Sequence, residues 1–400
     1  MHFQVADQID AFRAEVRDFL RKNLPADLAM KFQKMRAAPA DLLRWQRILN
    51  ANGWGAPYWP KAHGGTGWTV QERLVFDEEC SIAGAPSPDI FAHKLIGPAL
   101  NHFGTPEQKA RHAGGIIRGD SLWCQGFSEP GSGSDLASLR TAAVLQDDHY
   151  VVNGQKIWTS YAHQSDWIFM LVRTDPTVKK QAGITMLLAD MKSPGITVRP
   201  ILSIDGRHHL NEVFIEDLRI PVSNRVGEEG DGWKITKFLL NNEHASAAEL
   251  HVLQGYLRRL KQLATEWGTG TEPLIARPNF ALQLARFEAE VNAIAMMVSR
   301  VAAMEQAGNL SPEAHALGCM LKVRATELQQ SMSLFLVESS GDCGAIAYPT
   351  DHGTPPKLAY PFQEVVGGIA SEAFFRRAST IYGGSSEVQR GIASSLLFQF

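Results

Sequence analysis

The chain has 400 residues, with a hydrophobic content of 44%, a charged content of 20% and a formal net charge of −3. At roughly 150 residues per domain this length suggests two or three domains, and the composition is ordinary for a globular protein. Because the sequence has no block of like charges and no basic stripe, we expect neither nucleic acid nor an anionic membrane as a partner.

Residues 1–120 are predicted to form an N-terminal helical domain. Its first helix is indicated by apolar residues at the spacing of one helix face, and Pro25 ends the pattern. The residues of this stripe are Phe12, Val16, Phe19 and Leu20. A second helix is indicated by Leu43, Trp45 and Leu49, and the Gly- and Pro-rich residues 53–67 are predicted to form a loop.

Residues 121–231 are predicted to form a middle domain, a small antiparallel β-barrel or sandwich. Short apolar runs at 150–152, 167–172 and 184–188 are separated by turn residues, which is typical of such sheets. Asn153-Gly154 is predicted to be a hairpin turn. Residues 213–221 (VFIEDLRIP) are predicted to form the strand that leaves this domain.

Residues 232–400 are predicted to form a C-terminal helix bundle. Three long apolar stripes at helical spacing lie within 253–267, 287–301 and 321–335. The expected fold class is therefore α+β and multidomain, with a helical, a β and a second helical domain in chain order.

The cysteines and the N-terminus exclude other classes of protein. Four widely spaced cysteines form no CxxC pair and no Cys/His cluster of zinc spacing, so we expect reduced thiols and no metal site. The first residues lack the apolar core of a signal peptide, and no apolar run reaches the ~18 residues that span a bilayer. We expect a cytoplasmic protein without a membrane partner.

Two segments of the middle domain have the composition of a ligand site. In FSEPGSGSD (127–135) small residues follow a Pro-Gly turn, which lets backbone N–H groups and hydroxyls approach a ligand. In NGQKIWTS (153–160) an aromatic residue precedes two hydroxyls, which suits a flat, partly polar ring. Taken alone, each segment is as readily a structural loop or part of a core.

These segments, with FLLNNEH (238–244) and YGGSSEVQR (382–390), occur in the order found in one family. Over nearly its whole length the chain resembles the acyl-CoA dehydrogenases, and most closely the large-subunit type of pimeloyl-CoA dehydrogenase. The resemblance implies an FAD cofactor, an acyl-CoA substrate and electron-transfer flavoprotein, or an equivalent carrier, as electron acceptor. The FAD-binding positions that it implies are Gln125, Phe127, Ser128, Gly133, Ser134, Trp158, Thr159, Ser160, Ser385, Ser386 and Glu387. The substrate-binding positions that it implies are Ser134, Asn241, His244 and Gly384.

The resemblance also suggests which residue is the catalytic base. Many members of the family carry a catalytic glutamate after the tyrosine of the C-terminal motif, where this chain has Gly383. Other members carry the base on the helix that opens the C-terminal domain, where this chain has Glu243. We therefore expect Glu243 to remove the α-proton while flavin N5 accepts the β-hydrogen as hydride, and the N–H of Gly383 to bind the thioester carbonyl. Without the resemblance, Glu243 would be read as a solvated helix carboxylate.

The chain departs from the family in the segments that reach the FAD of a neighbouring subunit. WGTGTEPLIARPNF (267–280) replaces the Arg-x-x-Phe-Gly motif, and ESSGDCGAIA (338–347) replaces a glycine-rich motif. Two assemblies remain open: an α2β2 tetramer with a sister acyl-CoA dehydrogenase subunit, or a homo-oligomer that uses Arg277 or Arg286. Two other functions also remain open, a non-catalytic partner subunit and a flavin oxidase or monooxygenase. The acyl group is not specified by the sequence.

Overall fold

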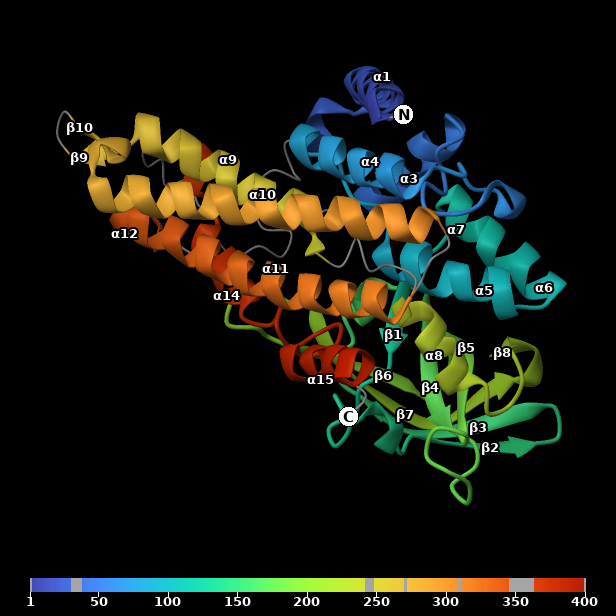
Figure 1. Ribbon diagram of the computed structural model, residues 1–400. Coiled ribbons are helices and arrows are strands. Elements are labelled where there is room, and N and C mark those ends of the chain that lie inside the picture. Colours follow the sequence, from blue (N-terminus) through green and yellow to red (C-terminus); the bar gives the residue numbers. More distant parts are fainter. Residues whose placement is uncertain are drawn as a thin grey trace.

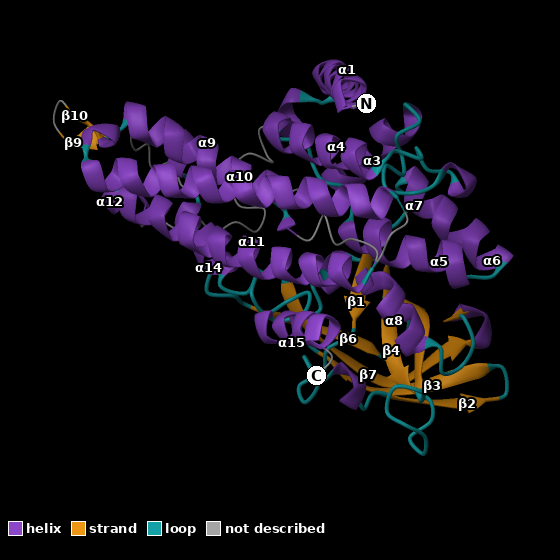
Figure 2. Cartoon of the chain, in the orientation of Figure 1, coloured by secondary structure: helices purple, strands orange, loops and turns teal. Residues whose placement is uncertain are grey.

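A computed structural model describes residues 2–29, 38–241, 248–269, 272–307, 311–344 and 363–398. Helices form the first and last parts of the chain and strands gather in the middle part (Figure 1), with helices and strands almost completely segregated (Figure 2). The predicted order of a helical region, a β region and a helical bundle is confirmed. None of the helices described has the length and apolar character needed to cross a membrane.

The N-terminal region is built on amphipathic helices around one core. The predicted stripe of the first helix is buried and packs with Trp45 and Leu49, whose helix was also predicted. A capping box between Thr69 and Glu72 begins the helix that follows the predicted loop. The helices are α1 (His2–Asn23), α3 (Pro39–Ala51), η1 (Lys61–His63), α4 (Val70–Ala83), η2 (Phe91–Ile96), α5 (Gly97–Phe103), α6 (Pro106–Gln108), η3 (Lys109–Ala113) and α7 (Gly114–Arg118).

The middle region is one eight-stranded sheet in the order β6-β7-β3-β2-β4-β5-β8, with β1 beside β4. Most neighbours are antiparallel, as predicted, but β1 and β2 each run parallel to β4. Residues 168–172 of β4 and 184–188 of β5, two neighbouring strands, are wholly buried. The strands are β1 (Trp123–Gly126), β2 (Ala142–Gln146), β3 (His149–Lys156), β4 (Trp167–Arg173), β5 (Ile184–Asp190), β6 (Ile196–Ile201), β7 (Leu210–Pro221) and β8 (Arg225–Val226). Short helices η4 (Leu136–Ser138), η5 (Ala162–Gln164) and η6 (Val222–Asn224) connect them.

The hairpin turn predicted at Asn153-Gly154 is wrong. Both residues lie inside β3, where the pairing with β7 shifts register between Val152 and Gly154. A Cβ on Gly154 would lie 2.7 Å from the Cα of Thr141, so glycine is required by a close approach of two strands. The hairpin between β2 and β3 instead turns at Asp147 and Asp148.

The C-terminal region is a bundle of long helices. The three predicted stripes fall on α9, α10 and α11 and share one core. The helices are α8 (Gly232–Asn241), α9 (Leu250–Glu266), η8 (Leu274–Ala276), α10 (Pro278–Gln306), α11 (Pro312–Ser339), α12 (Gly341–Gly344), α13 (Gln363–Val366), α14 (Ile369–Arg376) and α15 (Ser386–Phe398). A two-stranded hairpin, β9 (Gly268–Thr269) with β10 (Glu272–Pro273), lies where the family's arginine motif is absent.

Candidate active site

The turn after β1 presents small residues on a rigid frame. Glu129 and Ser132 exchange two backbone hydrogen bonds of 2.8 and 3.0 Å, and Ser132 Oγ donates to the carbonyl of Asp135 at 2.9 Å. Gly133 and Ser134, both predicted ligand residues, are exposed on this turn, and no atom lies within 4 Å of a Cβ built on Gly133. The turn therefore offers its N–H groups to an incoming group without a side chain in the way.

A buried ion pair fixes this turn to the end of β3. Lys156 Nζ lies 2.8 Å from Glu129 Oε1, and the two side chains are 0% and 7% exposed. Glu129 also accepts the N–H groups of Arg140 and Thr141 at 2.6 and 2.8 Å. Burial lowers the pKa of Lys156 to about 8, although Glu129 partly offsets it. For Glu129 burial acts to raise the pKa, but Lys156 and the N–H donors more than compensate and lower it.

Backbone contacts hold the two predicted flavin segments side by side. Ile157 N–H donates to the carbonyl of Ser128 at 2.9 Å, and Lys156 Nζ donates to the carbonyl of Phe127 at 3.3 Å. The ring of Phe127 meets Phe169 of β4 edge-on at 5.7 Å, and Gln125 lies in β1 paired with the same residue. The structure thus brings the turn after β1 and the end of β3 together.

Trp158 and Thr159 form an aromatic face beside a buried hydroxyl. Trp158 has a φ of 59° and its side chain remains 56% exposed, which is unusual for a large ring in a sheet domain. Thr159 is 1% exposed. Its N–H donates to the carbonyl of Asn211 at 3.0 Å, and the side-chain amide of Asn211 donates to the carbonyl of Thr159 at 3.0 Å. Its Oγ1 is buried and finds no partner in the described part of the chain. A buried hydroxyl without a partner costs free energy unless a ligand supplies one.

The C-terminal motif forms a second glycine turn followed by α15. Gly383 and Gly384 have φ values of 64° and 84°, a region that favours glycine. Within the described residues nothing accepts a hydrogen bond from the N–H of Gly383, and a Cβ there would meet no atom within 4 Å. Ser385 Oγ caps α15 by accepting the N–H of Val388 at 3.3 Å. The buried Ser386 Oγ, like that of Thr159, has no described partner.

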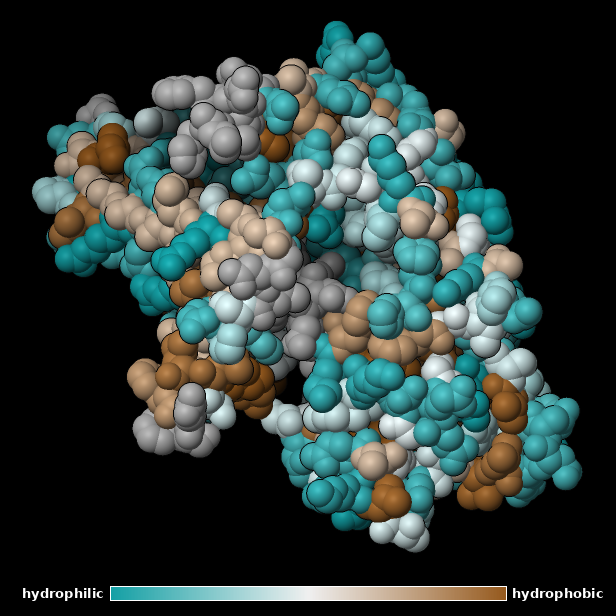
Figure 3. Space-filling model, turned by 45° about the vertical axis from the view of Figure 1, so that its right-hand side comes forward, coloured by the Kyte–Doolittle hydropathy of each residue, from teal (hydrophilic) through white to brown (hydrophobic). Residues whose placement is uncertain are grey.

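Aromatic contacts link the sheet to the C-terminal turn. The ring of His209 lies between two aromatic rings, with centroid distances of 6.2 Å to Tyr161, just after the Trp158 segment, and 5.4 Å to Phe375. The Phe375 ring in turn lies 6.2 Å from the ring of Tyr382. Figure 1 shows α15 beside the sheet and below α11, and Figure 3 shows a surface that is hollowed near the middle of the face in view. The predicted flavin segments and the glycine turn therefore belong to one region of the protein.

A network of charges behind this turn was not predicted. Arg376 Nη1 lies 3.1 Å from Glu249 Oε2, Arg376 Nη2 lies 2.9 Å from Glu372 Oε1, and Tyr256 donates to the same Glu372 oxygen at 2.7 Å. Burial acts to raise the pKa of Glu372, but Arg376 and the other donors outweigh it, so that its pKa is lowered to about 2. Burial acts to raise the pKa of Glu249, but Arg376 and the other partners outweigh it and lower the pKa, and its side chain remains 38% exposed. Nothing local in the sequence marks these residues as neighbours.

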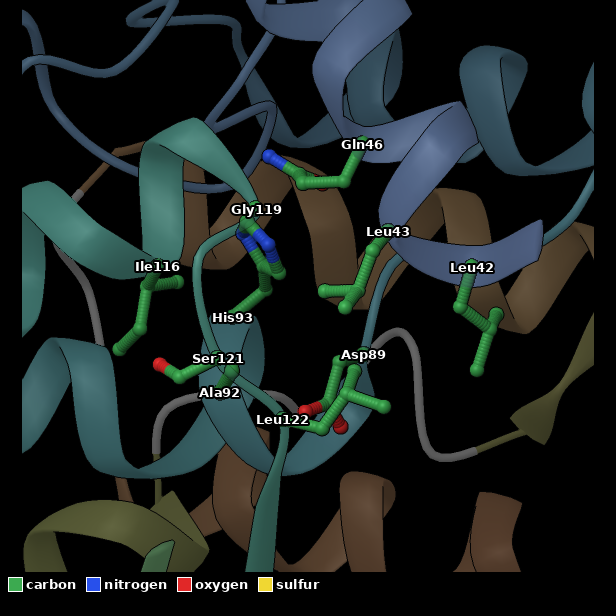
Figure 4. A pocket seen from close by; sticks show the side chains of 10 residues that line it. All are labelled: Leu42, Leu43, Gln46, Asp89, Ala92, His93, Ile116, Gly119, Ser121 and Leu122. Carbon is green, nitrogen blue, oxygen red and sulfur yellow. The ribbon is translucent and has the colours of Figure 1, made fainter. Parts of the chain in front are cut away.

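One small cavity lies elsewhere, in the N-terminal region (Figure 4). His93, Gln46 and Leu122 are among the residues that line it, and its volume of about 10 Å³ holds roughly one water. Burial lowers the pKa of His93 to about 3, so the ring is neutral. This cavity is too small for a flavin or an acyl thioester.

Several predicted site residues cannot be placed. Glu243 and His244 lie outside the described residues, and Asn241 is described only as the last residue of α8. Their roles stay predictions. In the described ranges no group of three or more His, Cys, Asp or Glu side chains could hold a metal, and the four cysteines are unpaired.

The chain thus has a sheet region between two helical regions in sequence, with an exposed aromatic ring beside a buried hydroxyl that lacks a partner in the described residues. The sequence matches the N-terminal domain of acyl-CoA dehydrogenases over residues 6–120, their middle domain over 124–218 and their C-terminal domain over 230–397. The chain therefore belongs to the acyl-CoA dehydrogenase family and is a flavoprotein oxidoreductase.

Individual relatives agree with this assignment. The chain is 34% identical to acyl-CoA dehydrogenase IpdE1 of Mycobacterium tuberculosis over 404 residues, 96% of each chain. Among solved structures it is similar to Tcur3481-Tcur3483, described as a steroid ACAD, with 28% identity, 98% of each chain covered and a TM-score of 0.85. It is also similar to the ChsE4-ChsE5 complex of Mycobacterium tuberculosis, with 30% identity, coverage of 98% of this chain and 97% of that one, and a TM-score of 0.83.

Proposed function

We propose that the chain carries out FAD-dependent α,β-dehydrogenation of an acyl-CoA thioester, with Glu243 as the base. The observation that carries this proposal is the pair of buried, unpartnered hydroxyls of Thr159 and Ser386, on the two segments where the family binds its flavin. The exposed ring of Trp158 beside Thr159 supplies the apolar wall that a flat ring system needs. The described residues thus fit a flavin.

Each part of this region has a task in the proposed binding mode. Trp158 would pack on the isoalloxazine, with Thr159 and Ser160 as its polar partners. The N–H groups and hydroxyls of Ser128, Gly133 and Ser134 would face the cofactor and the pantetheine arm of the substrate. Ser385, Ser386 and Glu387 would contact the cofactor from the C-terminal side.

The chemistry divides between a base and a hydrogen-bond donor. The N–H of Gly383 would donate to the thioester carbonyl and stabilise the negative charge that develops on its oxygen. Glu243 would remove the α-proton, and burial against the acyl group would raise its pKa and make it a stronger base. Because residue 383 has no side chain and no atom lies within 4 Å of a Cβ built there, the turn itself would leave room for a base that comes from another segment. When bound, the flavin supplies the hydride acceptor for the β-hydrogen.

Glu243→Gln tests the base. The variant should remain yellow while the bleaching of its flavin by acyl-CoA slows by about 10²- to 10⁴-fold, the usual loss for a general base. Glu266→Gln, on the exposed side of α9, is the matched control and should bleach at the wild-type rate. If Glu243→Gln also bleaches at the wild-type rate, the base is another residue.

We also propose that a sister chain completes the FAD site in an α2β2 assembly. The chain lacks the arginine motif that reaches a neighbour's FAD, and the similar ChsE4-ChsE5 structure is a complex of two different chains. The competing arrangement is a homo-oligomer in which Arg277 or Arg286 supplies the cation. A panel of acyl-CoAs, beginning with steroid-derived thioesters and including dicarboxylyl and aromatic ones, should be tested with an electron-transfer flavoprotein or an artificial acceptor.

A non-catalytic subunit or a flavin oxidase would give different results in the same assays. A non-catalytic subunit would leave the rate unchanged when Glu243 is replaced. An oxidase would reoxidise its reduced flavin rapidly with oxygen.

A further inference from the structure

A buried lysine holds both ends of the C-terminal glycine turn. Lys322, on α11, is only 6% exposed, and its Nζ donates to the carbonyls of Ser379 at 2.9 Å and Gly384 at 2.8 Å. In the described part of the chain no other donor reaches either carbonyl. The two acceptors flank Tyr382 and Gly383, so a single ammonium fixes the width of the turn that carries the free N–H.

Other contacts of the turn depend on this frame. Gln389 Nε2 donates to the carbonyl of Gly383 at 3.2 Å, and Tyr382 N–H donates to the carbonyl of Ala378 at 3.0 Å. Lys322 Nζ also lies 6.0 Å from the centroid of the Tyr382 ring, within reach of a cation–π contact. These contacts leave the Gly383 N–H unpaired while its neighbours are held in place.

The position of Lys322 is costly for the protein. Burial lowers the pKa of its ammonium to about 8, and the carboxylates of Glu249 and Glu387 only partly offset this effect. An apolar residue at position 322 would avoid that cost, since Cys319 and Ala325, one turn away on the same face of α11, are apolar and buried. A desolvated charge directed at two carbonyls of one turn is therefore best explained by a need to position that turn.

We infer that Lys322 is a positioning residue for the reaction: it holds the turn so that the Gly383 N–H meets the thioester carbonyl. This inference rests on the proposed function. Lys322 acts through the turn and does not contact the reacting atoms. Charge-assisted hydrogen bonds to two carbonyls restrict the turn more strongly than neutral donors would. A shift of the N–H donor by about 1 Å can lower a rate by roughly 10²-fold.

The test compares Lys322→Met and Lys322→Gln with Lys261→Met, which removes an exposed lysine paired with Glu288. Two probes separate positioning from folding. Acetoacetyl-CoA ionises to an enolate whose charge is shared by the thioester oxygen, and butyryl-CoA is a saturated thioester of the same length. The third measurement is the rate of flavin bleaching by an acyl-CoA that bleaches the wild type.

Lys322→Met is expected to bind the acetoacetyl-CoA enolate about 10-fold more weakly relative to butyryl-CoA, and to bleach roughly 10²-fold more slowly. Its FAD content should be unchanged, and Lys261→Met should match the wild type in every respect. Lys322→Gln keeps a shorter, neutral donor, so its affinity ratio and bleaching rate should lie between those of Lys322→Met and those of the wild type. It also serves as the test if the methionine variant does not fold.

The outcomes distinguish this inference from the proposed function. Folded variants with the wild-type affinity ratio and bleaching rate would overturn the inference alone, even if their melting temperatures fall. A wild-type protein that binds none of the thioesters and is bleached by none would overturn the proposed function, and the inference with it.

Discussion

Replacing Lys156 with methionine is expected to destabilise the middle sheet and weaken its hold on FAD. The change removes the only cation that the described residues place within ion-pair distance of the buried Glu129 carboxylate. Glu129 keeps the N–H groups of Arg140 and Thr141, but these do not neutralise its charge. The turn that carries Gly133 would then be held mainly by its backbone contacts.

The magnitude follows from burial. Removing one partner of a buried ion pair typically lowers the free energy of unfolding by about 3–5 kcal/mol, because the other charge is left without a counter-ion. In wild type the lowered pKa of Lys156, about 8 against a usual 10.5, shows that burying the ammonium is itself unfavourable. The pair therefore adds little net stability. The loss of free energy of unfolding in the variant comes from the Glu129 carboxylate, which stays buried without a counter-ion.

Urea unfolding followed by tryptophan fluorescence, together with FAD content after gel filtration, measures both effects. The double variant Glu129→Gln/Lys156→Met is the control, since a neutral amide can still accept the two backbone N–H groups. It should recover about 2 kcal/mol or more of the loss, which is the non-additivity expected of residues in contact.

The pH dependence provides a second check. Without the ammonium, the pKa of Glu129 should rise from its lowered wild-type value, so the carboxylate of the folded variant takes up a proton more readily than that of the unfolded chain. The difference in free energy of unfolding between wild type and Lys156→Met should then be largest near pH 7 and become smaller as the pH falls toward 5. A single variant as stable as the wild type, or a double variant less stable than the single one, would refute this account of the pair.

Three further predictions follow from the same region. Trp158→Ala should weaken FAD retention and change the flavin spectrum; unchanged FAD affinity and spectrum would mean that the exposed Trp158 ring does not contact the flavin. Glu372 has a pKa of about 2 in the folded protein against a usual 4.5, so its ionised form contributes on the order of 3 kcal/mol to the free energy of unfolding above pH 4.5. This contribution is lost as the pH falls toward 2. Arg376→Met should remove most of this acid dependence, and an unchanged acid unfolding profile would contradict the assignment. FAD stoichiometry tests the assembly: about half occupancy that appears only on co-expression supports α2β2, whereas one FAD per chain in an active homo-oligomer refutes it.

The parts of the fold that depend on local patterns could be predicted from the sequence. The stripe from Phe12 to Leu20 and the stripes on α9, α10 and α11 follow the helical period, and the alternation of apolar runs with turns marked β3 to β5. The turn at Asn153-Gly154 failed because the same dipeptide also suits a strand irregularity, and only the approach of Thr141 shows which is needed.

The charged contacts around the site depend on residues far apart in the chain. Arg376 meets Glu249 across 127 positions, and Lys322 meets Gly384 across 62. No spacing rule connects such residues. The one sequence signal for Lys322 is its place between two apolar residues, Leu321 and Val323. A buried lysine can be recognised only once it is known that other parts of the chain pack against every face of its helix.

The glycine at residue 383 separates two tasks that a glutamate there would combine. A base carried on the turn would move together with the N–H that binds the thioester carbonyl, so any shift of the turn would alter both. In the proposed reaction the thioester carbonyl would be positioned by the turn of Gly383, which Lys322 holds from α11, whereas the proposed base, Glu243, lies between α8 and α9 in the sequence. The two groups can then be perturbed independently. Loss of Lys322 should weaken enolate binding as well as bleaching, whereas loss of the Glu243 carboxylate should slow proton removal and leave the oxyanion contact intact, so the ratio of acetoacetyl-CoA to butyryl-CoA affinity separates the two roles.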